Sequence, residues 1–460
     1  MAARSRFHAA YALCVVQAAA TAVEGERPDP QRGLAVLHGV ALQGFGLEAE
    51  HFQALWTAWP EPLRSEADGA SAEERRQLLF DRYGLFLDPE RLDADGRPST
   101  VPAAFAESEP GRWTLSCLAC HSGSVDGRFV NGLGNNRFAF QTLVRDLVRY
   151  KVQNRISLTE QERGMAFVPL GSTDGTTNAQ IFSIVLASFR ETDLDRAPRR
   201  RSIERALSHD LDAPALWNVR WKSRLYLDGY VDKDPRVLMQ FALGLANDGE
   251  TIRGWDVDFD GVLAWIESLE APKWPGPLDR GLADAGRSVF DAHCAKCHGK
   301  YEGEVRYPEK VVPLDVVLTD PVRAEAMPRS FREWMSKSWL THEGEVDVDL
   351  DPDGYVAPPL VGVWATAPYF HNGSVPTLWH VLHPDERPAV WQHDRDRDFD
   401  PDRVGLAVVT ADKAPDADGP ASNRRWFDTG KFGKSAQGHT FPARLEVAER
   451  RALLEYLKTL

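Results

Sequence analysis

Cysteine is scarce in this sequence, with five residues among 460. Four of them lie in two segments of the form C-x-x-C-H, residues 117–121 and 294–298. The fifth, Cys14, lies near the N-terminus, so no pair of cysteines remains for a disulfide. A small fold held together by several disulfides is therefore excluded.

Long apolar runs are also missing after the first residues of the chain. Residues 1–22 have the features of a signal peptide, with Arg4 and Arg6, an apolar stretch too short to span a bilayer, and a small-x-small site at residues 20–22. We expect cleavage before Val23, which removes Cys14. The mature chain is then predicted to be exported to the periplasm or beyond, without a transmembrane segment.

The net charge of -14 also restricts which partners the chain is expected to bind. An acidic surface disfavours nucleic acid and anionic membranes as partners. It suits a small basic redox protein, and a quinol-linked electron carrier is the other partner we consider.

The two C-x-x-C-H segments predict attachment sites for c-type haem. Cys117 and Cys120 can each form a thioether to one vinyl group of a porphyrin, and His121 then offers its imidazole to the iron. Cys294, Cys297 and His298 repeat the arrangement. A zinc site is the alternative, but the two C-x-x-C pairs that bind one zinc ion normally lie within a few tens of residues of each other. We therefore expect two covalently bound haem c groups.

The segments around the motifs indicate a mainly α fold. Residues 264–269 end an amphipathic helix with an aromatic-aliphatic pattern that recurs at residues 455–460. Each closing helix would pack across an opening helix, as in a small cytochrome c. We predict an N-terminal haem domain over 23–271, enlarged by long loops and extra helices, a proline-rich linker over 272–278, and a C-terminal haem domain over 279–460.

The sixth iron ligand decides whether a haem passes electrons or binds oxygen or peroxide. For the second haem, His439 lies just before the closing helix and is the predicted ligand beside His298. His371, in a loop bounded by Pro368 and Gly373, is the runner-up and is otherwise expected near a propionate or the pocket wall.

The first haem has no comparable candidate ligand. No histidine lies between His121 and His209, and Met239 sits in an apolar run typical of a core. Trp217 lies between the two motifs in sequence, where it can bridge electron transfer, line the pocket or simply be core. The first iron is therefore the better candidate for an open, reactive site.

Several stretches make the chain similar to the bacterial di-haem cytochrome c peroxidase superfamily, closest to its rubber-oxygenase-like branch. They are residues 364–378, 438–441, 456–460 and 213–229. The resemblance implies an N-terminal haem that activates peroxide or oxygen and a C-terminal, bis-histidine haem that relays electrons. The chain lacks the methionine ligand and the additional histidine of the main-branch peroxidases, and it is shorter than the rubber oxygenases.

The sequence thus predicts an exported di-haem oxidoreductase, peroxidase-like or oxygenase-like. One alternative is a pure electron-transfer cytochrome with two six-coordinate haems, and another is an oxygenase that cleaves a hydrophobic organic substrate. The turn Asp349–Gly354 resembles the start of a calcium loop, although Leu360 stands where the closing glutamate is expected.

Overall fold

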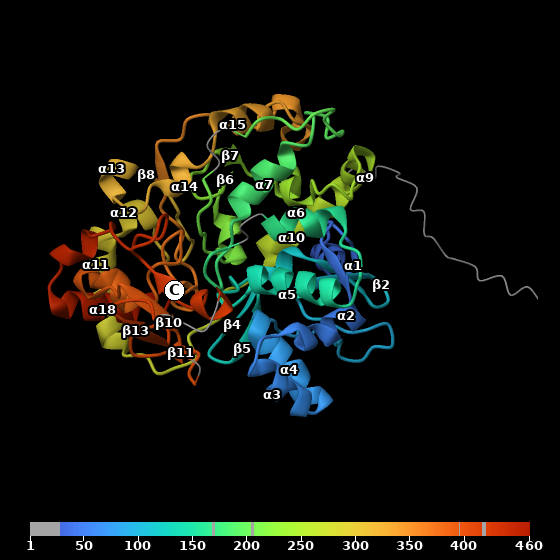
Figure 1. Ribbon diagram of the computed structural model, residues 1–460. Helices are drawn as coiled ribbons and strands as arrows, with labels where there is room; N and C mark the ends of the chain where they lie inside the picture. The colour runs from blue at the N-terminus through green and yellow to red at the C-terminus, as the bar shows by residue number, and fades with distance from the viewer. Residues whose placement is uncertain (1–27, 168–170, 204–206, 395, 416–419) are drawn as a thin grey trace, which may run out of the picture.

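A computed structural model describes residues 28–167, 171–203, 207–394, 396–415 and 420–460 (Figure 1). The predicted signal peptide lies outside these residues. Helices account for 41% and strands for 13% of the structure, with several small sheets. The prediction of a mainly α fold is therefore wrong, and the fold is mixed α/β. The reason is that the long inter-helix segments, which we expected to be loops, pair into short antiparallel strands, some with distant partners, as where Gly46 lies opposite Thr114.

The helices are mostly short. They are α1 (Pro30–Gly39), α2 (Ala49–Ala54), α3 (Leu63–Gly69), α4 (Ala72–Tyr83), α5 (Phe140–Gln153), α6 (Glu160–Phe167), α7 (Ala179–Ala187), α8 (Pro235–Leu238), α9 (Gly249–Gly254), α10 (Asp256–Ser268), α11 (Arg280–His293), α12 (Ala295–His298), α13 (Leu314–Val317), α14 (Val322–Glu325), α15 (Arg329–Met335), α16 (Leu378–Leu382), α17 (Pro420–Asn423) and α18 (Val447–Leu457). No helix in the described ranges is long and apolar enough to cross a membrane.

All the strand pairs are antiparallel. The strands are β1 (Gly46–Glu48), β2 (Phe105–Glu109), β3 (Arg112–Leu115), β4 (Ser122–Val125), β5 (Arg128–Asn131), β6 (Arg224–Leu225), β7 (Val231–Asp232), β8 (Val311–Pro313), β9 (Gly354–Val356), β10 (Val390–His393), β11 (Phe399–Asp400), β12 (Gly405–Leu406), β13 (Val408–Ala411) and β14 (Phe427–Asp428). Two sheets have three strands, in the orders β1-β3-β2 and β13-β10-β14, and the others are two-stranded.

The first opening and closing helices, α1 and α10, pack on each other. Helix α1 begins at the N-cap Asp29, whose side chain accepts a hydrogen bond from the Gln31 amide, and Pro30 supplies the fixed φ that suits a first helical position. The helices cross where Gly33 meets Gly261, because a Cβ on Gly33 would lie 2.0 Å from the Gly261 oxygen. A side chain at this crossing would force the helices apart.

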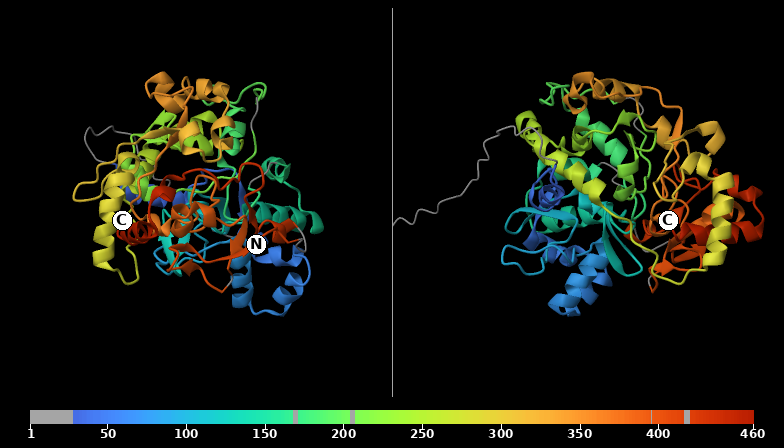
Figure 2. Two further views of the ribbon diagram at one scale, coloured as in Figure 1. Left: turned by 90° about the vertical axis from the view of Figure 1, so that its left-hand side faces the viewer. Right: turned by 180° about the vertical axis from the view of Figure 1, so that it is seen from behind.

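The second pair, α11 and α18, repeats this arrangement on the opposite side of the molecule (Figures 1 and 2). Helix α11 also starts at an aspartate cap, Asp279, and buries Phe290 on its inner face. Its crossing point is Gly286, where a Cβ would lie 1.9 Å from the Ala452 oxygen. The expectation of a closing helix packed across an opening helix holds in both halves of the chain.

The core is divided among several clusters rather than one. Residues 45–165 contribute an aromatic cluster around Phe52 and Trp113, which fills the insertion between α1 and the first C-x-x-C-H segment. A second cluster surrounds α1, α7 and α10 and also takes in residues 327–340. A third surrounds α11 and α18 and includes Trp217. Residues from each half of the chain therefore pack in the core of the other.

Candidate haem sites

The first C-x-x-C-H segment forms one turn of 3-10 helix, Cys117–Ala119. Ser116 caps this turn by accepting a hydrogen bond from the Leu118 amide, and its hydroxyl donates to the Leu37 carbonyl of α1 at 2.8 Å. Burial raises the pKa of the Cys117 thiol to about 11 and that of Cys120 to about 12.

The His121 imidazole is held from one side only. Its Nδ1 lies 3.1 Å from the carbonyl oxygen of Pro214, so the Nδ1–H tautomer is favoured and Nε2 keeps its lone pair. Burial lowers the pKa of His121 to about 4. The ring is therefore neutral at pH 7, which is the form that binds a metal.

The second C-x-x-C-H segment follows α11 directly, and α12 carries it to His298. The Nδ1 of His298 lies 2.9 Å from the Pro358 carbonyl oxygen, and burial lowers the pKa of this histidine too. Burial also raises the pKa of the Cys294 thiol to about 11. Both histidines are thus oriented by a proline carbonyl, which is the outer partner that fixes a ligating imidazole.

The two prolines belong to an internal repeat that the sequence reasoning missed. Residues 213–231 correspond to 357–375 at a constant offset of 144 positions, from Ala213 to Ala357. Both copies contain a two-stranded turn, with Leu225 opposite Val231 and Tyr369 opposite Val375. The pattern A-P-x-L, followed by aromatic-x-(Asp/Asn)-Gly-x-Val, is a signal that a search for repeats can find.

The backbone of the two turns also agrees. Tyr226 and its counterpart Phe370 both have positive φ, 69° and 66°, and the glycines three residues later have 61° and 71°. Positive φ is uncommon for an aromatic residue, so a shared occurrence at equivalent positions is strong evidence of a common structure.

The two copies contact each other reciprocally. The Val356 amide donates to the Leu227 carbonyl at 2.8 Å, and the Asp212 amide donates to the His371 carbonyl at 2.9 Å. Asp212 lies 144 positions before Val356, and Leu227 lies 144 positions before His371, so the second bond is the first with the two copies interchanged. Such self-complementary pairing is the mark of a two-fold relation, here within one chain.

Trp217 lies at the centre of this arrangement. It is 1% exposed, and its Nε1 donates at 2.8 Å to the carbonyl of Val361, its own counterpart in the other copy. Trp217 is three residues after Pro214, and Val361 is three residues after Pro358. The indole therefore connects the carbonyl that orients His121 to the one that orients His298 through two short, equal stretches of chain.

His439 stands opposite His298. The centroids of the two rings are 6.1 Å apart, with an interplanar angle of 69°. Two imidazoles on one first-row metal, each with a metal–nitrogen distance of about 2 Å, place their ring centroids roughly 6 Å apart. Burial lowers the pKa of His439 to about 3, and its Nδ1 is buried without a hydrogen-bond partner in the described chain. These residues fit a haem with two histidine ligands.

The first site differs on the corresponding side. No aromatic or imidazole ring in the described part of the chain forms a ring contact with His121. Tyr226 takes the place of Phe370, and its hydroxyl accepts a hydrogen bond from the Gln240 side chain and donates to the Val237 carbonyl at 3.3 Å. Burial is the main cause that raises the pKa of this phenol, and the Asp228 carboxylate and then the Cys117 thiol add to it. Met239 is fully buried in the core cluster around α1, α7 and α10.

His371 does not face either motif histidine in the described structure. Its ring packs against Tyr355 at 4.7 Å, and burial lowers its pKa to about 3. Arg323 is the next cause of that shift.

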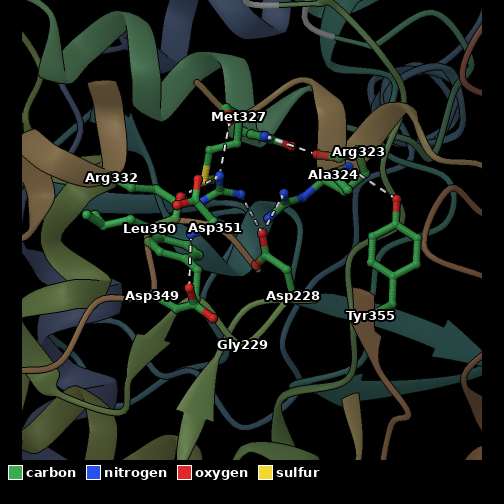
Figure 3. Close-up of polar contacts among 12 residues, drawn as sticks. Asp228, Gly229, Arg323, Ala324, Met327, Arg332, Asp349, Leu350, Asp351 and Tyr355 are labelled. Carbon is green, nitrogen blue, oxygen red and sulfur yellow. Dashed lines mark hydrogen bonds and ion pairs between the residues drawn. The ribbon is translucent and has the colours of Figure 1, made fainter. Parts of the chain in front are cut away.

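Arg323 belongs to a buried ion cluster that was not predicted from the sequence. Asp228 accepts from Arg323 at 3.3 Å and from Arg332 at 3.2 Å, with side chains no more than 6% exposed (Figure 3). One carboxylate here compensates two guanidinium groups. The sequence feature connected with this cluster is that Asp228 in the first copy of the repeat corresponds to Asn372 in the second.

The calcium suggestion for residues 349–354 finds no support in the geometry. The Asp351 carboxylate pairs with Arg329, and the Asp349 carboxylate accepts a hydrogen bond from the Asp351 amide (Figure 3). No group of three metal-binding side chains is present within the described ranges.

Comparison with known proteins gives two relatives, both from Sinorhizobium fredii (strain NBRC 101917 / NGR234). "Uncharacterized protein y4iM" is 28% identical over 282 residues, which cover 54% of this chain and 64% of the relative. "Uncharacterized protein y4iJ" is 28% identical over 260 residues, which cover 42% and 41%. The chain therefore spans less than two thirds of each curated relative.

A family comparison places its match on the second copy of the repeat. The segment includes Pro358, Phe370 and His371, and it supports haem c binding and, in general terms, a c-type cytochrome oxidoreductase. It agrees with the resemblance to the rubber-oxygenase-like branch but does not extend to the wider peroxidase superfamily. Residues 354–392 are thus similar to the family described as RoxA-like, cytochrome c-like.

Proposed function

We propose that this chain is a di-haem oxidoreductase with two unequal irons. Cys117, Cys120 and His121 hold a first haem that keeps an open position for peroxide or oxygen. The second haem is held by Cys294, Cys297 and His298, with His439 as the sixth ligand, and it relays electrons. A haem with an open position supplies the oxidising chemistry, whereas one with two strong ligands supplies only electron transfer.

One observation carries this proposal. The His298 ring has a second imidazole 6.1 Å away, whereas the His121 ring has only the Pro214 carbonyl as a described polar partner. The two-fold relation strengthens this comparison of the two sites, because Phe370 and Tyr226 occupy equivalent positions in the two copies of the repeat. Phe370 packs against His439, with ring centroids 6.0 Å apart, and its counterpart Tyr226 instead bonds to Gln240. A carboxamide is a far weaker iron ligand than imidazole.

Tyr226 and Gln240 are then the groups that would meet an oxidant at the first site. The Gln240 amide donates to the phenol, and the phenol donates to the Val237 carbonyl, so both side chains are fixed in orientation. Burial keeps the phenol protonated at neutral pH. Because the phenol O–H and the Gln240 amide N–H groups already donate to Val237 and to each other, the pair would accept hydrogen bonds from a donor such as peroxide while remaining neutral.

Electrons would pass between the sites through Trp217. This indole is buried, hydrogen bonded to Val361 and placed between the two orienting prolines. The donor we propose is a small redox protein or quinol-linked carrier outside the cytoplasm, which suits the acidic chain and its expected export.

Electron paramagnetic resonance of the oxidised protein tests the proposal. We expect one low-spin signal from the bis-histidine site and one high-spin signal from the first iron. Two low-spin signals would refute the open site and favour the pure electron-transfer cytochrome. Oxidation of a reduced small cytochrome in the presence of peroxide, compared with oxygen consumption in the presence of an apolar alkene, then separates peroxidase from oxygenase activity.

A further inference from the structure

Arg387 is a partly buried cation that the proposed chemistry does not use. It forms no ion pair with any described residue, and burial lowers its pKa to about 10. An unpaired guanidinium in such a place is costly unless its donors are satisfied. The question is therefore where its N–H groups point.

All five N–H groups of Arg387 are directed at main-chain carbonyl oxygens. Nε donates to the His380 carbonyl at 3.0 Å. Nη1 donates to the carbonyls of Ala436 and Gly438 at 2.6 and 2.8 Å. Nη2 donates to the carbonyls of Val381 and His439 at 3.4 and 3.5 Å. No donor is left over for a carboxylate or a haem propionate.

Three of these carbonyls lie in the segment 436–439, which ends in the proposed iron ligand. This segment needs support because two consecutive residues, Gly438 and His439, have positive φ, 81° and 46°. For histidine that conformation is unfavourable and persists only where the surroundings enforce it. The His439 amide is held by the Val317 carbonyl at 2.7 Å, and the carbonyl side of the segment is held by Arg387.

Arg387 also fixes the ring that supports the ligand. Its guanidinium lies 4.8 Å from the centroid of Phe370, and that ring packs edge-on against His439 at 6.0 Å. One side chain thus contacts the backbone of His439 and the aromatic wall beside its imidazole. The planar fork of arginine is required for this, because lysine offers three donors from a single point.

We propose that Arg387 is a positioning residue that holds His439 against His298 and thereby keeps the second iron closed to external ligands. We call its guanidinium with the five carbonyls the Arg387 clamp. The inference rests on the proposed bis-histidine site. It adds that closure of this site is enforced by a residue whose described contacts are main-chain carbonyls and the Phe370 ring, and not either imidazole.

Carbon monoxide binding to the reduced protein tests the clamp, because only an iron with an open or labile sixth position takes it up. We expect one equivalent per wild-type chain and close to two for Arg387→Lys and Arg387→Gln. Imidazole added to the oxidised variants should restore the low-spin spectrum of the second haem. Arg190→Lys is the matched control, since Arg190 is fully buried and also donates to main-chain carbonyls, and it should leave the bis-histidine signal unchanged.

The outcomes separate this inference from the proposed function. Two equivalents in the wild type would mean that His439 does not close the second iron, and the proposed function fails. One equivalent in both the wild type and the Arg387 variants would overturn the clamp alone. Arg387→Lys retains the positive charge, so an effect confined to Arg387→Gln would show that charge, not positioning, is responsible. Parallel loss of both haem spectra on mild heating would mean a general structural role and would also overturn it.

Discussion

Substituting Gly286 with alanine should loosen the second haem site from a distance. Gly286 lies at the crossing of α11 and α18, and α11 leads directly into Cys294. Helix α18 starts at Val447, soon after His439. A change in the separation of these two helices should therefore alter how His439 approaches His298.

The magnitude follows from the contact. The new Cβ would lie 1.9 Å from the Ala452 carbonyl oxygen, whereas real Cβ contacts are essentially never under 3.0 Å, so the helices must part by at least 1.1 Å. The atom that is met belongs to the backbone and has no rotamer that relieves the clash. Overpacking of this kind costs about 1–3 kcal/mol, here towards the upper end, and alanine regains up to about 1 kcal/mol of helix propensity. We expect a net loss of about 2 kcal/mol.

Gly281→Ala is the matched control, because Gly281 lies in the same helix and a Cβ there meets only an Asp279 oxygen at 3.5 Å. It should raise stability by up to about 1 kcal/mol through helix propensity alone. Urea unfolding followed by the haem absorption should therefore separate the two variants by about 3 kcal/mol. Equal stability of Gly281→Ala and Gly286→Ala would refute the packing argument, and loss of the low-spin signal in Gly286→Ala alone would support it.

Three further predictions test other contacts. His439→Ala should convert the second haem to high spin, whereas His371→Ala should leave it low spin in the same spectrum, and the opposite pattern would make His371 the ligand. Asp228→Asn leaves two buried guanidinium groups without a carboxylate and should lower the free energy of unfolding by about 3–5 kcal/mol, against about 0–1 kcal/mol for the exposed Asp351→Asn. Asp174 has its pKa raised by burial from 3.8 to about 6, so the folded state binds the proton more tightly and the stability contributed by this group falls as pH rises from about 4 to 6. Asp174→Asn should remove that slope, worth at most about 3 kcal/mol in urea titrations at pH 4 and pH 7, and identical pH profiles would contradict the assignment.

Haem c binding in general was predictable from the sequence, because C-x-x-C-H constrains neighbouring residues within a single turn, whereas the two attachment sites and their ligands stay predictions. The pairing of opening and closing helices was also predictable from their apolar periodicity. The strand content was not, because each strand is two to five residues long and formed only by pairing with a nearby segment. Such short stretches carry no periodicity that distinguishes them from loops.

The burial of several histidines was equally hidden in the sequence. His209, His380 and His383 are buried, with 3–5% of each residue exposed, although the sequence carries no signal of this burial. Each has a local partner that polar sequence context does not reveal. The Nδ1 of His209 bonds to the Leu207 carbonyl, that of His380 to the Thr377 hydroxyl, and that of His383 to the Trp379 carbonyl. Tertiary packing decided these positions.

The 144-residue repeat explains how a two-fold arrangement produces two unequal sites. At equivalent positions of the two turns, one copy has Asp228 and the other Asn372. Asn372 can donate, and its amide bonds to the Gly433 and Ser435 carbonyls at 3.2 and 3.1 Å, which ties the turn to the segment that leads to His439.

A carboxylate cannot donate hydrogen bonds, so Asp228 recruits cations instead. Arg323 and Arg332, from α14 and α15, donate to its carboxylate. The difference between Asp228 and Asn372 therefore changes what each turn contacts: the first turn pairs with α14 and α15, and the second is tied to the segment that leads to His439, beside His298. Under the proposed function, we expect this difference to contribute to the inequality of the two iron sites.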